Sequence, residues 1–197
     1  MKNQRPMVAI YGGSNFQPNS KPFKDASTFA RLIAEYVHIF HGGISMDGDS
    51  GLMLAVTQGA QKRGNCMMTG VVHEAIEHWT IKLLPKNQVK KVANFDIRNG
   101  ILTDPDKIRV VCKGDAGTQL ECFTAVRKNE IARKMKVDAG IEPIIALYEK
   151  KDEWETIAKC FKALGMSSEV VDNIKVFTSP VDAAYWVVEK HLKLMLI

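Results

Sequence analysis

The sequence predicts an α/β protein built on a doubly wound, mostly parallel sheet with helices on both faces. Short apolar segments of strand length alternate along the chain with longer segments whose apolar residues recur at helical spacing. Turns rich in glycine and serine follow several of the strand segments. Strands that are separated by helices need crossover connections, and right-handed crossovers place helices on both faces of a parallel sheet.

Six segments have the length and the apolar composition of buried strands. In chain order these are residues 6–11, 44–46, 66–72, 108–112, 143–148 and 174–177. Apolar residues at helical spacing predict helices between them, within residues 29–40, 52–63, 118–136 and 153–164, and a last helix that starts at Ser179-Pro180. Because no repeat, low-complexity tract or linker interrupts this pattern, we expect one Rossmann-like domain over residues 1–197.

Length, composition and charge narrow the class of protein. The chain has 197 residues, of which 46% are hydrophobic and 25% charged, and its formal net charge is only +5. The segment 73–92 contains Lys82, Lys86, Lys90 and Lys91. A solvated loop or helix face explains these lysines better than a basic patch that binds phosphate or nucleic acid. No apolar run approaches the ~20 residues that span a bilayer. We therefore expect a cytoplasmic protein with neither a nucleic-acid nor a membrane partner.

Cysteine and histidine spacing argues against a metal centre. The four cysteines form no C-x-x-C pair and lie in apolar sequence, which is typical of reduced core thiols. His73 and His78 are five residues apart, which separates them by about 140° around a helix. Zinc-protease helices need a spacing of four, so the sequence predicts no metal site here.

Three turns of small residues follow predicted strands and would meet at the carboxyl edge of the sheet. They are Gly12-Gly13-Ser14-Asn15, Gly48-Asp49-Ser50-Gly51 and Gly114-Asp115-Ala116-Gly117-Thr118. Glycine lets backbone approach a ligand closely, and a helix N-terminus presents unpaired amides that suit a phosphate. Tight strand-to-helix packing explains any one of these turns equally well, but three at one edge favour a ligand site. Neither the dinucleotide fingerprint nor a P-loop is present.

The third turn resembles a known family. The segment 113–121, Lys-Gly-Asp-Ala-Gly-Thr-Gln-Leu-Glu, is similar to the P-G-G-x-G-T-x-x-E signature of the Lonely Guy family, whose members are phosphoribohydrolases of cytokinin nucleotides and related nucleoside 5′-monophosphates. Residues 47–53 resemble the glycine-rich turn of that family, and residues 10–15 resemble its opening strand and turn. Arg98 lies fifteen residues before Lys113, where the family has an essential arginine.

The resemblance implies an enzyme that cleaves the N-glycosidic bond of a nucleoside 5′-monophosphate and releases base and ribose 5-phosphate without metal or organic cofactor. Glu121 would stabilise the oxocarbenium-like sugar and position water, while Arg98 would orient Glu121. The resemblance also implies a homodimer or larger homo-oligomer. Phosphate and nucleotide would be held by Gly13, Ser14, Gly48, Ser50, Gly51, Lys113, Gly114, Asp115, Gly117 and Thr118. From spacing alone, Glu121 is better explained as a solvated residue on a helix than as a catalytic residue.

A second hypothesis is a non-catalytic nucleotide or nucleotide-derivative binding protein, a sensor or carrier on the same fold. Asp49 and Asp115 stand where the family has glycine, and Lys113 stands where it has proline. A carboxylate beside a bound phosphate repels it. The two aspartates therefore favour the binding protein, whereas the pairing of Arg98 with Glu121 favours the enzyme.

Overall fold

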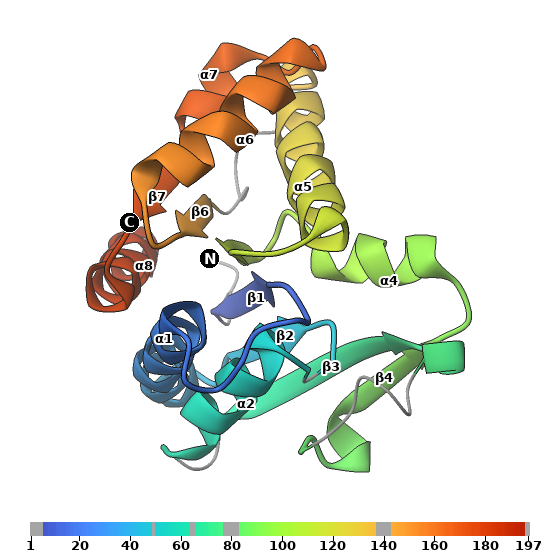
Figure 1. The fold of residues 1–197 in the computed structure, drawn as a ribbon, viewed down its shortest axis with the longest axis vertical. Helices are drawn as coiled ribbons and strands as arrows, with labels where there is room; N and C mark the ends of the chain where they lie inside the picture. The colour runs from blue at the N-terminus through green and yellow to red at the C-terminus, as the bar shows by residue number, and fades with distance from the viewer. Residues whose placement is uncertain (1–5, 49, 64–65, 77–82, 137–142, 196–197) are drawn as a thin grey trace.

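The computed structural model describes residues 6–48, 50–63, 66–76, 83–136 and 143–195, and within them seven strands form one sheet (Figure 1). The strands are β1 (Met7–Tyr11), β2 (Gly43–Met46), β3 (Met67–His73), β4 (Val89–Val92), β5 (Ile108–Cys112), β6 (Ile144–Leu147) and β7 (Lys175–Phe177). Every neighbouring pair is parallel, and the order is β4-β3-β2-β1-β5-β6-β7. The predicted doubly wound parallel sheet is confirmed.

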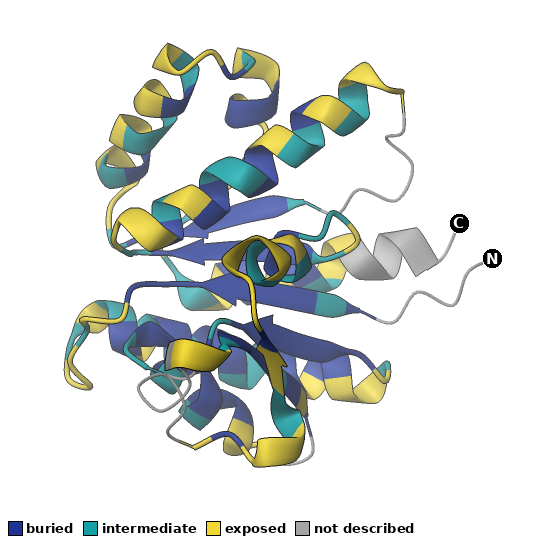
Figure 2. Cartoon of the chain, turned by 90° about the vertical axis from the view of Figure 1, so that its right-hand side faces the viewer, coloured by how far each residue is buried: buried dark blue, intermediate teal, exposed yellow. Residues whose placement is uncertain are grey.

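Helices connect the strands and cover both faces of the sheet (Figures 1 and 2). They are α1 (Lys21–Ile39), α2 (Leu52–Gln61), α4 (Phe95–Leu102), α5 (Ala116–Lys134), α6 (Lys151–Ala163), α7 (Ser168–Asp172) and α8 (Pro180–Met195), with short 3-10 turns at Glu74–Ile76 and Lys86–Gln88. Alternate residues of β1 show the two layers: Val8 and Ile10 pack with α1, α2 and α8, whereas Ala9 and Tyr11 pack with α5, α6 and α7. Strand periodicity thus divides the core into two apolar clusters.

The strand β4 and the helices α4 and α7 have no counterpart in the sequence prediction, and the first two of these are mostly exposed. β4 lies at one edge of the sheet and carries the exposed Lys90 and Lys91. α4 has eight residues, of which only Leu102 is buried. Neither segment buries enough side chains to produce a readable apolar period. Lys82 and His78 lie outside the described residues.

Three turns pack against one another at the carboxyl ends of β1, β2 and β5. The amide of Gly13 donates to the carbonyl of Lys113 at 3.1 Å, next to the point where the strand order reverses. A side chain at Gly114 would lie 2.2 Å from Oγ1 of Thr118. Gly51 has a φ of +54°, and a Cβ there would lie 2.4 Å from the carbonyl oxygen of Gly13. Packing alone therefore requires glycine at these positions.

α4 is capped at its first turn and is tied to β1 at its other end. The side chain of Asn94 caps its first turn by accepting from the amide of Asp96 at 2.6 Å. At its other end, the buried hydroxyl of Tyr11 donates to the carbonyl of Leu102 at 2.7 Å. Because α4 is fixed to β1 in this way, Arg98 is placed beside the strand ends.

Cysteines and membrane-spanning segments test two further expectations. Cys66, Cys112 and Cys122 are buried free thiols, as expected, but Cys160 is exposed, so the expectation of a core thiol is wrong for Cys160. Within the described ranges, no helix has the length and apolar character needed to cross a bilayer.

Candidate functional site

A cavity of about 350 Å³ lies at the carboxyl ends of β1, β2 and β5, beside α4. Parallel sheets of this type bind ligands at the carboxyl edge, where the strand order reverses. The cavity is lined by Gly12, Ser14, Asp47, Ser50, Phe95, Asp96, Arg98, Asn99, Asp115, Gly117, Thr118, Leu120 and Glu121. Each of the three glycine turns therefore contributes to one cavity.

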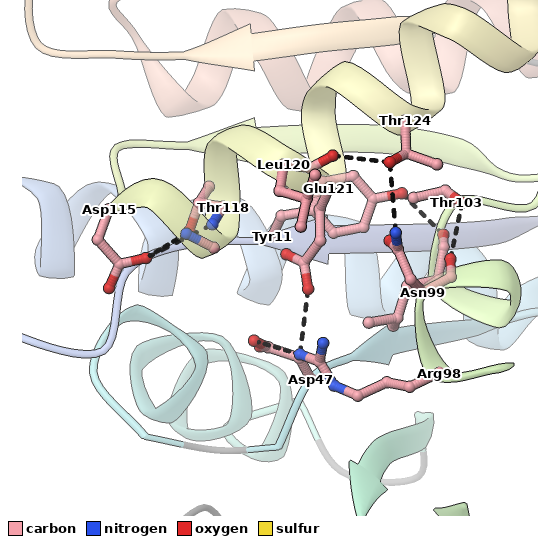
Figure 3. Close-up of polar contacts among 12 residues, drawn as sticks. Tyr11, Asp47, Arg98, Asn99, Thr103, Asp115, Thr118, Leu120, Glu121 and Thr124 are labelled. Carbon is pink, nitrogen blue, oxygen red and sulfur yellow. Dashed lines mark hydrogen bonds and ion pairs between the residues drawn. The ribbon is translucent and has the colours of Figure 1, made fainter. Parts of the chain in front are cut away.

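One guanidinium joins two carboxylates at the wall of the cavity (Figure 3). Nη2 of Arg98 donates to Oδ2 of Asp47 at 2.8 Å and lies 3.0 Å from Oε1 of Glu121. The exposed fractions of the three side chains are 14% for Arg98, 24% for Asp47 and 6% for Glu121. The group formed by Asp47, Arg98 and Glu121, here called the triad, has one positive and two negative groups when fully ionised.

Burial makes the triad retain a proton. Burial, reinforced by the charge of Asp47, raises the pKa of Glu121 to about 8, while Arg98 acts in the opposite direction. Burial also raises the pKa of Asp47, again against the effect of Arg98. At neutral pH the triad therefore holds a proton on the side of Glu121 and is close to electrically neutral.

Three hydroxyl groups also line the cavity. Ser14 follows β1, Ser50 follows β2, and Thr118 lies in the first turn of α5. Their hydroxyls have no hydrogen-bond partner among the residues that the structure describes. Three such hydroxyls can donate to the oxygen atoms of an anion.

A carboxylate of the chain already occupies the N-terminus of α5. Oδ1 of Asp115 accepts from the amide of Gly117 at 3.1 Å and from the amide of Thr118 at 3.5 Å. Figure 3 shows this carboxylate over the first turn of the helix. The amides that the sequence analysis assigned to a ligand phosphate are therefore engaged by the side chain of Asp115.

The structure brings seven of the predicted site residues to the cavity and leaves five outside its lining. Those in the lining are Ser14, Ser50, Arg98, Asp115, Gly117, Thr118 and Glu121. Those outside it are Gly13, Gly48, Gly51, Lys113 and Gly114. Nζ of Lys113 instead lies 2.7 Å from Oε1 of Glu153, and this hydrogen bond raises the pKa of the lysine. Asp49 lies outside the described residues.

Several lining residues were missed by the sequence analysis. Asp47 had a usable signal, because a carboxylate directly after a strand lies at the carboxyl edge of the sheet. Phe95, Asp96 and Asn99 had none, because they belong to the helix α4 that the sequence did not predict. Asn99 also connects α4 to α5, since its Nδ2 donates to Oγ1 of Thr124 at 3.3 Å.

Comparison with known proteins gives a structural likeness and no sequence relationship. No protein-family model and no curated protein sequence matches the chain. The molybdenum cofactor binding protein from the phototrophic bacterium Rippkaea orientalis superposes with a TM-score of 0.67 at 17% identity, over 98% of each chain. The molybdenum cofactor carrier protein from Chlamydomonas reinhardtii superposes with a TM-score of 0.62 at 16% identity, over 94% of this chain and 97% of the other.

These findings correct the assignment to the Lonely Guy family. The matching structures are molybdenum cofactor binding or carrier proteins, and the signature in the segment 113–121 is supported by no family match. The expected phosphoribohydrolase activity is therefore wrong. The physical reason is visible at the turn: tight packing requires Gly114, and Asp115 fills the place intended for the phosphate.

Proposed function

We propose that this chain is a non-catalytic carrier of a small phosphorylated heterocyclic compound, with the molybdenum cofactor as the first candidate. The observation that supports this most directly is the cavity of about 350 Å³ at the carboxyl edge of the sheet. Structures with the same fold over nearly the whole chain belong to proteins that bind or carry the molybdenum cofactor. The ligand is cargo in this proposal, and no bond of it is broken.

The residues of the cavity fit such a compound. The molybdenum cofactor combines a flat pterin ring system with a phosphate group, so it needs both oxyanion donors and a partly apolar wall. The hydroxyls of Ser14, Ser50 and Thr118 can donate to phosphate oxygens. Phe95 and Leu120 line the same cavity and are 53% and 60% exposed, so they offer apolar surface to a ring.

The ionic contacts of the site favour retention of a ligand over its hydrolysis. Glu121 is buried and its Oε1 is paired with Arg98, so this oxygen is engaged by the guanidinium and is not free to accept a proton from water. Asp115 covers the amides that would otherwise hold a substrate phosphate close to Glu121. A nucleoside monophosphate is therefore poorly placed for hydrolysis.

Retention of the cofactor tests the proposal. The molybdenum cofactor is released from a molybdoenzyme without oxygen, incubated with the purified chain and passed through a gel-filtration column. We expect molybdenum and pterin to elute with the protein in equal amounts, and AMP incubated with the protein to yield no free base. Absence of both molybdenum and pterin from the protein fraction would overturn the proposal.

A matched pair of variants places the retained cofactor in the cavity. Ser14 lines the cavity, whereas its neighbour Asn15 is exposed outside the lining. Ser14→Phe should fill the cavity and abolish retention, while Asn15→Phe should retain the cofactor as the parent does. Equal retention by both variants would show that the cofactor binds elsewhere. The expected homodimer stays a prediction, which light scattering of the same fractions can check.

A further inference from the structure

The cavity has two chemically different halves, and they cannot receive the same part of a ligand. One half presents the hydroxyls of Ser14, Ser50 and Thr118. The other half is formed by the triad, with Asp96 from the same helix as Arg98. Asp115 lies beside Thr118, where its carboxylate accepts from the amides of Gly117 and Thr118. The guanidinium of Arg98 is already engaged by two carboxyl groups, so the three hydroxyls are the donors left for a phosphate. The triad half requires a group that donates hydrogen bonds.

Glu121 carries an acceptor that the protein itself leaves unused. Its side chain is 6% exposed, and its Oε1 is paired with Arg98 at 3.0 Å. Its second oxygen, Oε2, has no partner among the described residues, and Glu121 lines the cavity. A carboxyl oxygen at the wall of the cavity that has no donor from the protein can accept a hydrogen bond from an N–H group of a ligand.

Arg98 supplies the complementary donor. Its Nη2 already serves Asp47 and Glu121 and its Nε is shut away from solvent, so the other N–H groups of this cavity-lining side chain are the ones that a ligand can reach. The guanidinium carries five N–H donors in a fixed plane. The triad therefore offers a carboxylate acceptor beside a guanidinium donor, which is complementary to a ring edge that carries adjacent N–H groups and a carbonyl oxygen.

An aromatic side chain stands at the same end of the cavity. The ring of Phe95 stacks on the imidazole of His73 with centroids 4.1 Å apart and an interplanar angle of 14°. Phe95 also lines the cavity and is 53% exposed, so the part of its ring that His73 does not cover is available to a ligand. Offset stacking on such a ring favours a flat heterocycle.

We propose that the cavity selects 2-amino-4-oxo heterocycles of the pterin and guanine type, with their N–H edge on Glu121, their carbonyl on Arg98 and their ring face against Phe95. This inference rests on the proposed carrier function and names the chemical group that the carrier recognises. Ligand N–H groups take the place of the proton that the triad holds when empty. Adenine presents a reversed edge, with a ring nitrogen acceptor where guanine has a donor, and is rejected.

Three nucleotides that differ only at this edge test the inference on the parent protein. GMP carries the ring N–H and the 2-amino group, IMP lacks the amino group, and AMP reverses the pattern. We expect calorimetric dissociation constants to rise from GMP to IMP to AMP by about 10-fold at each step, because each change removes one hydrogen bond between the ligand and Glu121. Equal binding of GMP and AMP would overturn the inference.

Two variants connect the selectivity to named side chains. Glu121→Gln keeps the shape of the side chain but removes one acceptor oxygen, and it should reduce the preference for GMP over IMP to less than about 2-fold. Phe95→Ala should weaken GMP and IMP alike by about 10-fold, whereas Ile97→Ala, at an exposed apolar residue of the same helix outside the cavity lining, should leave binding unchanged. Preserved selectivity in folded Glu121→Gln would contradict the assignment of Glu121.

The nucleotide and cofactor experiments test two separate claims, so either claim can be contradicted while the other stands. If the molybdenum cofactor is retained but the three nucleotides bind alike, the carrier function stands and the recognition of the ring edge by the triad is wrong. If GMP is preferred but the molybdenum cofactor is not retained, the recognition of the ring edge stands and the cofactor is not the cargo. The parent protein alone separates these two results, so the test does not depend on the folding of any variant.

Discussion

The two faces of the sheet differ in what they bury. The face covered by α1, α2 and α8 is filled by apolar side chains such as Phe29 and Ile33. The face beside α5 holds the charged side chains that are buried in the described part of the chain, namely Arg109, Glu121 and Glu130. Apolar burial stabilises the fold, whereas a buried charge costs free energy unless it is paired. Both faces therefore have an apolar cluster, but only the second combines it with buried charged groups that need partners.

The largest expected effect lies on the apolar face. Phe29 of α1 is fully buried, so Phe29→Ala removes a ring from a packed core and should lower the free energy of unfolding by about 4 kcal/mol. Leu120→Ala on α5 is the control, because Leu120 is 60% exposed and should change that free energy by less than about 0.5 kcal/mol. Urea unfolding followed by circular dichroism measures both. Similar losses in the two variants would contradict the stabilising effect of burying Phe29.

An effect with a pH signature is expected on the charged face. Glu121 has a pKa of about 8 in the folded protein against an ordinary value of 4.5, so the folded state keeps a proton that the unfolded chain releases. Stability of the parent should therefore fall as the pH rises between these two values, by about 4 kcal/mol from pH 5 to pH 9. Glu121→Gln cannot ionise and should show a flatter dependence in urea unfolding.

The control for this titration is Glu155→Gln on α6. Glu155 is exposed, so its replacement should leave the slope of stability against pH as it is in the parent. A parent whose stability is constant from about pH 5 to pH 9 would show that Glu121 titrates as an ordinary carboxyl group.

The smallest expected effect concerns the attachment of α4. Tyr11→Phe removes the hydroxyl that donates to the carbonyl of Leu102 and should lower the free energy of unfolding by about 1 kcal/mol. Hydrogen exchange should also quicken at amides of α4, because this contact holds one end of the helix. Tyr185→Phe, at a tyrosine that is 71% exposed, should change neither measurement. Unchanged exchange in α4 would mean that its other contacts suffice to hold it.

The sequence could predict those strands and helices whose buried apolar residues recur at the spacing of a strand or a helix. The strand segments 6–11 and 108–112 alternate between helical segments, and both form central strands of the observed sheet. The edge strand β4 and the exposed helix α4 bury too little to leave such a pattern. The site was predictable only in part for the same reason. Contacts such as that of Arg98 with Asp47 join residues 51 positions apart and depend on where α4 is anchored.

The signature in residues 113–121 was a poor guide to function because the packing of the strand-to-helix turn already requires several of its residues. Gly114 is required by the closeness of Thr118, and an acceptor at residue 115 caps the first turn of α5. Any chain with this strand-to-helix turn is under the same steric demands, whatever it binds. The identity of the capping residue, an aspartate, was the more informative observation, and it favoured the binding protein.

The short lysine-bearing strands at the two borders of the sheet have a consequence for behaviour at high concentration. β4 has four residues and carries Lys90 and Lys91, and β7 has three residues and carries Lys175. An open border of a sheet offers free backbone groups to a strand from another molecule, and brief, positively charged borders discourage such pairing. The protein should accordingly resist fibrillar aggregation during storage, because Lys90, Lys91 and Lys175 discourage pairing of the edge strands with another molecule.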